Sequence, residues 1–241
     1  MYYGSIWLML ICLAISGIAS GRVKRTYAKY AQIRCRSGMT GHDTAVRLLR
    51  SNQIHDITVG STGGTLTDHY HPARGQVNLS DSTYNSTSIG AVAVAAHEVG
   101  HVLQNKTNYG PYRFRTAIVP VVNFGSRLAL PLVLIGLLLD TGVSYGGSDL
   151  GFQLAMLGVL LYGLSFVFAL VTLPVELNAS RRAKEMLLQT GVLTAEELPG
   201  AERVLSAAAM TYVASLFVSL LYFFRFLMMV LSLFGRRNSR R

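Results

Sequence analysis

Four long apolar runs constrain the fold of this 241-residue chain more than any other feature. Each run approaches or exceeds the roughly 20 residues that an α-helix needs to cross the hydrocarbon core of a bilayer. Hydrophobic residues make up 51% of the chain and charged residues only 14%, which is unlike an ordinary soluble domain. The sequence therefore predicts a mainly α-helical membrane protein with about four transmembrane helices, at residues 3–19, 118–139, 152–175 and within 207–234.

Positive charge gathers beside these runs and gives the chain a formal net charge of +10. A basic stretch follows the first run and contains Arg22, Lys24, Arg25, Lys29, Arg34 and Arg36. The positive-inside rule places such a stretch on the cytosolic side, where it also attracts anionic lipid. Residues 140–150 carry two Asp and no Lys or Arg, which fits the outer face. Membrane lipid is therefore an expected partner, and nucleic acid is not, because no motif that reads nucleic acid accompanies the charge.

The polar residues between the first two runs predict a small α+β domain. Thr40 is expected to cap a helix, with Asp43 as its capping-box partner. The basic stretch is expected to continue the first helix to Arg36. Turn residues and alternating patterns predict a short strand at 57–59, ended by GSTGG, and a hairpin at 66–80 with its turn at 72–75.

We expect the chain to divide into five segments. A transmembrane anchor at 1–20 precedes the α+β domain at 21–117, and a transmembrane hairpin follows at 118–175. The remaining segments are a cytosolic connection at 176–206, with a polar stretch at 194–203, and a C-terminal transmembrane or partly interfacial helix with a basic tail at 207–241.

Residues 91–104, AVAVAAHEVGHVLQ, predict a single helix within the α+β domain. His97 and His101 stand four residues apart, so both imidazoles leave the same helix face. Glu98 lies beside His97, where it can act as a general base. This HExxH spacing is typical of zinc metalloproteases. Two incidental histidines would not explain why an otherwise apolar helix carries His, Glu and His together, because buried charge is costly unless it is paired or bound to metal.

A catalytic zinc needs a third protein ligand and an open coordination position. Glu176 is a candidate, because it follows the third apolar run on the predicted cytosolic side. The alternative is a surface glutamate that pairs with Arg181 or Arg182 one turn later. Four further residues are candidates for holding a zinc ligand in place or contacting substrate: Asp68, His69, Tyr70 and Arg181. His69, Tyr70 and Arg181 are also candidates for stabilising an oxyanion. The alternative for the three hairpin residues is that they only shape the turn and lie on the surface.

Several blocks of the sequence resemble the YugP family of bacterial membrane zinc-dependent peptidases. They are KRTYAKYAQIRCRSGMTGHDTA, TLTDHY with the following Pro72, VNLSDSTYNSTSIGAVAVAAHEVGHVLQ, AIVPVVN and LPVELNASRRA. More distantly, the layout is similar to the HtpX and CAAX-prenyl-protease superfamily, in which two spans separate HExxH from a glutamate. ELNAS matches that motif at Glu176 and Ala179, whereas Ser180 stands where those relatives have Asp. The resemblance implies a zincin-like domain, Glu176 as third ligand and a multi-pass protein of the bacterial plasma membrane.

Together these features predict a membrane zinc metalloendopeptidase that hydrolyses a protein or peptide substrate. One Zn²⁺ per chain would be held by His97, His101 and Glu176, and Glu98 would act as general base on the cytosolic side. The alternative is a zinc-bound membrane scaffold or regulator that does not cleave. A transporter would carry ionisable groups deep in several spans, and only Arg127 and Arg225 fit that description.

Overall fold

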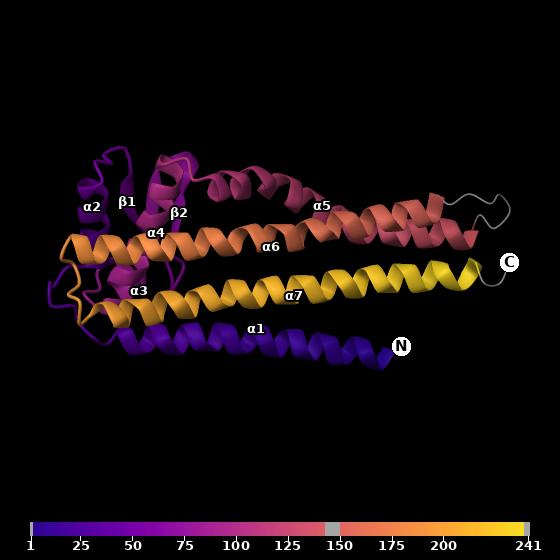
Figure 1. Cartoon of the computed structure of the whole chain (residues 1–241), viewed down its shortest axis with the longest axis horizontal. Coiled ribbons are helices and arrows are strands. Elements are labelled where there is room, and N and C mark those ends of the chain that lie inside the picture. Colours follow the sequence, from indigo (N-terminus) through magenta and orange to yellow (C-terminus); the bar gives the residue numbers. More distant parts are fainter. Residues whose placement is uncertain (1, 143–149, 239–241) are drawn as a thin grey trace. The chain divides into compact units, whose positions relative to one another are not determined.

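A computed structural model describes residues 2–142 and 150–238 of the chain (Figure 1). That part is mainly helical and contains one three-stranded sheet. The elements follow in the order α1 (Tyr2–Tyr30), α2 (Gly41–Ser51), β1 (Thr58–Thr62), β2 (His69–His71), the 3₁₀ turn η1 (Pro72–Arg74), β3 (Gln76–Ser80), α3 (Asp81–Tyr84), α4 (Ile89–Lys106), α5 (Gly110–Gly142), α6 (Leu150–Gln189) and α7 (Leu198–Asn238).

The helices α1, α5, α6 and α7 are long and apolar enough to cross a membrane, as the four apolar runs predict. Most of the connection at 140–150, expected on the outer face, lies outside the described residues. The polar connection expected at 194–203 is partly helical, because α7 already begins at Leu198. Pro199 is tolerated in this first turn, and Ala201, Val204 and Leu205 are buried in the core.

The helix α1 ends at Tyr30, so the expectation that it continues to Arg36 is wrong. The chain beyond Tyr30 pairs instead with the segment that leads into α4. The backbone N–H of Cys35 donates to Thr87 O at 2.9 Å, and that of Ile89 donates to Ile33 O at 2.8 Å. These bonds draw residues 33–35 out of the helix and tie the end of α1 to the start of α4.

The described residues form two compact units. The first comprises Met1–Tyr112 and Leu173–Ala214, and the second comprises Arg113–Thr172 and Ser215–Arg241. The helices α6 and α7 contribute to both units, whereas α4 and the sheet belong to the first alone.

The sheet of the first unit has the strand order β1-β3-β2. β2 pairs antiparallel with β3, with His69 opposite Asn78, which confirms the predicted hairpin. β1 begins at Thr58 and runs through Gly60 to Thr62, so it is longer than the strand predicted at 57–59. Parallel pairing with β3 along its whole length accounts for the extension. Asp43 and Thr40 form the predicted capping box of α2.

The helix α4 lies at the centre of the first unit's core. Buried side chains surround it from α2, β3, α6 and α7, including Leu48, Leu79, Leu187 and Val204. The core positions of α4 carry mainly Ala and Val, whose short side chains let neighbouring elements approach closely. At Gly100 a Cβ atom would lie only 2.6 Å from the carbonyl oxygen of Ala179. The absence of a side chain at Gly100 therefore lets the backbones of α4 and α6 touch.

The second unit packs α5, the first part of α6 and the last part of α7 around Val133, Ala155, Val159 and Val230. Gly158 allows close approach here as well, since a Cβ atom would lie 2.5 Å from Ala129 O. Small residues at helix contacts are typical of membrane proteins.

Candidate metal centre

The helix α4 presents His97 and His101 side by side, as their spacing predicts. Their ring centroids are 4.8 Å apart and the ring planes are nearly perpendicular. The helix is held at its start by Ser88, whose hydroxyl accepts the backbone N–H of Ala91 at 3.2 Å. Both imidazoles are therefore fixed on a capped, buried helix.

Glu176 reaches these imidazoles from α6. Its Oε2 lies 3.2 Å from His97 Nε2 and 3.5 Å from His101 Nε2. Ligand atoms of the three residues all lie within 4.8 Å of one another. Glu176 is only 2% exposed, which does not fit the alternative of a surface glutamate. The contact depends on the close approach of α4 and α6 at Gly100.

A network of side chains fixes the orientation of the His101 ring. The amide nitrogen of Gln104 donates to Val175 O at 2.7 Å and to Asn178 Oδ1 at 3.0 Å. A backbone carbonyl can only accept, so the amide oxygen of Gln104 faces His101 Nδ1, at 3.0 Å. Nδ1 then carries a proton, which leaves Nε2 as the His101 nitrogen that faces Glu176 and can bind a metal.

Ser180 plays the corresponding part for His97. Its hydroxyl lies 3.2 Å from His97 Nδ1, which leaves His97 Nε2 facing Glu176. No role could be predicted for Ser180 from the sequence, because the superfamily that the layout resembles has Asp at this position. Partners of this kind on the far ring nitrogen orient histidines that bind metal.

Glu98 lines a cavity of about 320 Å³ together with His97. It is 7% exposed and has no hydrogen-bond partner among the described residues. Burial raises the pKa of Glu98, and this effect outweighs the lowering by His101 and His97. A carboxyl of this kind, next to open space and without a partner, is suited to taking up a proton.

The imidazole of His101 is sensitive to the surrounding carboxylates. Burial by itself lowers its pKa, but the hydrogen bond and charge of Glu176, together with the charge of Glu98, outweigh burial and raise the pKa. Because a metal binds the neutral imidazole, metal binding at His101 Nε2 competes with protonation of this side chain.

The other predicted residues have mainly structural contacts. Asp68 lines the cavity with His97 and Glu98, but it also accepts hydrogen bonds from Ser80 N and Ser80 Oγ, both at 2.8 Å. His69 and Tyr70 do not line the cavity. His69 contacts Thr67 O and Asn78, the hydroxyl of Tyr70 accepts a hydrogen bond from Asn105, and Arg181 is exposed.

Comparison with known proteins identifies the family. The model of a family described as "Putative neutral zinc metallopeptidase" matches residues 5–231. The chain is 43% identical over 227 residues to "Putative membrane protease YugP" of Bacillus subtilis (strain 168), an alignment that covers 94% of this chain and 96% of that protein. No solved structure matches the chain significantly. With its four apolar helices, the chain is a multi-pass membrane protein that belongs to the YugP family of zinc metallopeptidases.

Proposed function

We propose that this protein is a membrane zinc metalloendopeptidase, with one Zn²⁺ per chain held by His97, His101 and Glu176. One observation carries the proposal: two imidazole Nε2 atoms and a buried carboxylate converge beside a cavity that also exposes an unpaired glutamate, Glu98. The family description, which names zinc and peptidase activity, supports it.

The residues fit a catalytic zinc better than a structural one. Two His and one Glu form a ligand set of catalytic zinc sites, in which water takes the fourth position. Structural sites usually have four protein ligands, and the group found among the described residues has three. The thiol of Cys35 contacts Ser37 and Met39 instead. This favours a peptidase over the alternative of a zinc-bound scaffold that does not cleave.

The proposed reaction is hydrolysis of a peptide bond. A zinc ion held by His97, His101 and Glu176 would supply a water of lowered pKa and would polarise the scissile carbonyl. Glu98 takes the proton of the attacking water and passes it to the leaving amine. Gln104 and Ser180 keep the two imidazoles in the tautomer and orientation that the ligand role needs.

The walls of the cavity support a proposal about the substrate. Apolar side chains dominate its walls, including Val23 of α1, Val94 of α4, and Val204, Leu205 and Ala208 of α7. Such walls favour an apolar residue beside the scissile bond. Since α1 and α7 are also candidate membrane spans, we expect membrane proteins or their segments as substrates.

The active site is proposed to face the cytosol. The cavity and the basic stretch of α1 belong to the same unit. Lys24 even lines the cavity itself. By the positive-inside rule, the basic residues support a position of this unit on the cytosolic side of the plasma membrane.

The test compares three single variants with the unchanged protein in detergent. Glu98→Gln should keep zinc and lose cleavage of an apolar peptide library, whereas Glu176→Ala should lose zinc. Glu185→Gln, an exposed position on α6, is the matched control and should retain both properties. Full cleavage by Glu98→Gln would remove Glu98 as base, and zinc retention without any cleavage in the unchanged protein would favour the scaffold.

A further inference from the structure

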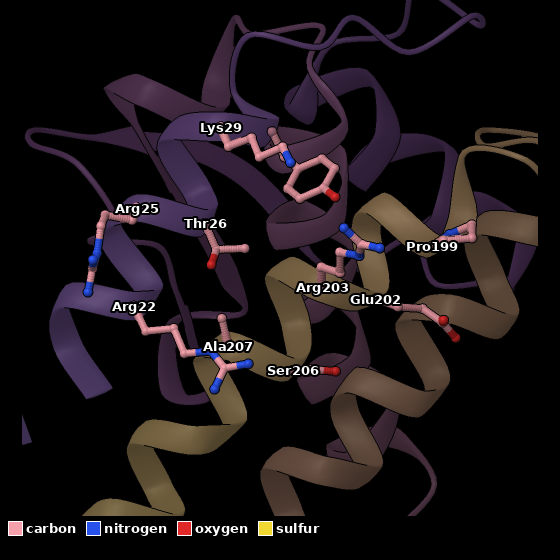
Figure 2. A pocket seen from close by; sticks show the side chains of 10 residues that line it. Arg22, Arg25, Thr26, Lys29, Pro199, Glu202, Arg203, Ser206 and Ala207 are labelled. Carbon is pink, nitrogen blue, oxygen red and sulfur yellow. The ribbon is translucent and has the colours of Figure 1, made fainter. Parts of the chain in front are cut away.

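A cavity of about 540 Å³ lies between α1 and α7 in the first unit, apart from the metal centre (Figure 2). Its polar walls are mainly basic. Four cationic side chains and three that carry a hydroxyl line it: Arg22, Arg25, Thr26, Lys29 and Tyr30 of α1, and Arg203 and Ser206 of α7.

The positive charge of this cavity is not balanced from within. Its acidic residue, Glu202, accepts a hydrogen bond from Lys184 at 3.0 Å, so that carboxylate already has a cationic partner. Arg22, Lys29 and Arg203 form no ion pair with any described acidic residue. Like charges in one concave site repel one another, and a bound anion removes that cost.

The cations of this cavity come from two different helices. Figure 2 shows Arg22 extending from α1 toward Ser206 and Ala207 of α7, whereas Arg25 turns away from them. Arg203 extends from α7 the other way, toward Lys29. Guanidinium groups bind phosphate oxygens through two parallel hydrogen bonds, and hydroxyls can donate to the oxygens that remain.

The cavity lies where charged and apolar surface meet. On α1 the exposed apolar residues Trp7, Leu13 and Ile18 precede Arg22, and on α7 the exposed Met210 and Val213 follow Ser206. In a multi-pass membrane protein this boundary is at the level of the lipid headgroups. Basic pockets between helices at that level bind anionic headgroups.

We propose that this cavity binds the phosphate of an anionic phospholipid whose acyl chains lie along the apolar surfaces of α1 and α7. Arg22, Lys29 and Arg203 supply positive charge for the phosphate oxygens, and Thr26 and Ser206 can donate hydrogen bonds to them. Free inorganic phosphate offers the same chemistry without acyl chains.

The experiment measures the binding of three probes to the full-length protein in a neutral detergent, by native mass spectrometry and thermal shift. The probes are dioctanoyl phosphatidylglycerol, dioctanoyl phosphatidylcholine and inorganic phosphate. Arg22→Gln with Arg203→Gln removes two cations from the cavity. Arg50→Gln with Arg74→Gln removes the same charge from exposed positions elsewhere in the unit and is the matched control.

The unchanged protein should bind phosphatidylglycerol most tightly, and added salt should weaken that binding. The cavity variant should bind it about 30-fold more weakly, since each cation near the membrane surface contributes roughly a factor of five to ten. The control should change less than about twofold. Equal losses in the two variants would show general charge attraction and overturn the site. Equal binding of phosphatidylcholine would overturn the role of charge, and equal binding of phosphate would overturn the lipid as the source.

Discussion

A methyl group at position 100 should separate the helices that build the metal centre. In Gly100→Ala the new Cβ atom would lie 2.6 Å from Ala179 O and 3.2 Å from the Ala179 carbonyl carbon and Cα. These are backbone atoms, so no side chain can rotate away. To reach an ordinary contact of 3.4 Å, α6 must move by about 0.8 Å. Glu176 lies on α6 one turn from this contact and moves with it.

The size of the effect follows from that displacement. Overpacking a tight contact costs about 1–3 kcal/mol of folding stability. A shift of about 1 Å in a reacting group can cost roughly 100-fold in rate. We therefore expect Gly100→Ala to lower kcat/KM about 100-fold and to weaken zinc binding measurably.

Zinc affinity, measured by competition with a chelator, and peptidase kcat/KM test this expectation. Gly17→Ala is the control, because it adds the same methyl group to a helix where nothing lies within 4 Å. It should leave both quantities unchanged. If Gly100→Ala behaves like Gly17→Ala in both assays, the close approach of α4 and α6 does not position Glu176, and the reasoning fails.

Three further perturbations probe separate contacts. Ser180→Ala removes the hydroxyl beside His97 Nδ1 and should weaken zinc binding about 10- to 100-fold in a chelator competition; unchanged affinity would contradict the orienting role. Burial raises the pKa of Glu98 above its ordinary 4.5. The folding stability of the metal-free protein should therefore fall as the pH rises through that raised value. Thermal unfolding in EDTA measures this loss, and Glu98→Gln should remove it. Thr40→Ala breaks the capping box with Asp43 and should cost about 1 kcal/mol in denaturant unfolding of the detergent-solubilised protein, with zinc content unchanged.

Local patterns in the sequence predicted the elements that depend on neighbouring residues. The apolar runs predicted the four long helices, Thr40 and Asp43 predicted a helix start, and residues 66–80 predicted a hairpin. The helix that carries His97 and His101 was also predicted, because its spacing and composition are local features. In each case the determining contacts lie within a few residues along the chain.

Contacts between distant segments were not predictable in the same way. The helix α1 ends at Tyr30 because residues 33–35 pair with the segment before α4. No sequence pattern near Tyr30 indicates that pairing. Gln104 and Ser180 act on the two imidazoles only once α4 and α6 touch. Their positions offered a weak signal, since Gln104 stands three residues after His101 on one face of α4, and Ser180 stands four residues after Glu176 on one face of α6.

The division of the metal centre between α4 and α6 sets an order of events during biosynthesis. Glu176 lies 79 residues after His97, so at about 5–20 residues per second it is synthesised roughly 4–16 s later. In that interval α5 and most of α6, two candidate membrane spans, must also be made. A nascent chain that stops before α6 has both imidazoles but lacks their carboxylate. The proposed peptidase is therefore assembled only after the hairpin of α5 and α6 has been synthesised, which keeps incomplete chains from cleaving their neighbours.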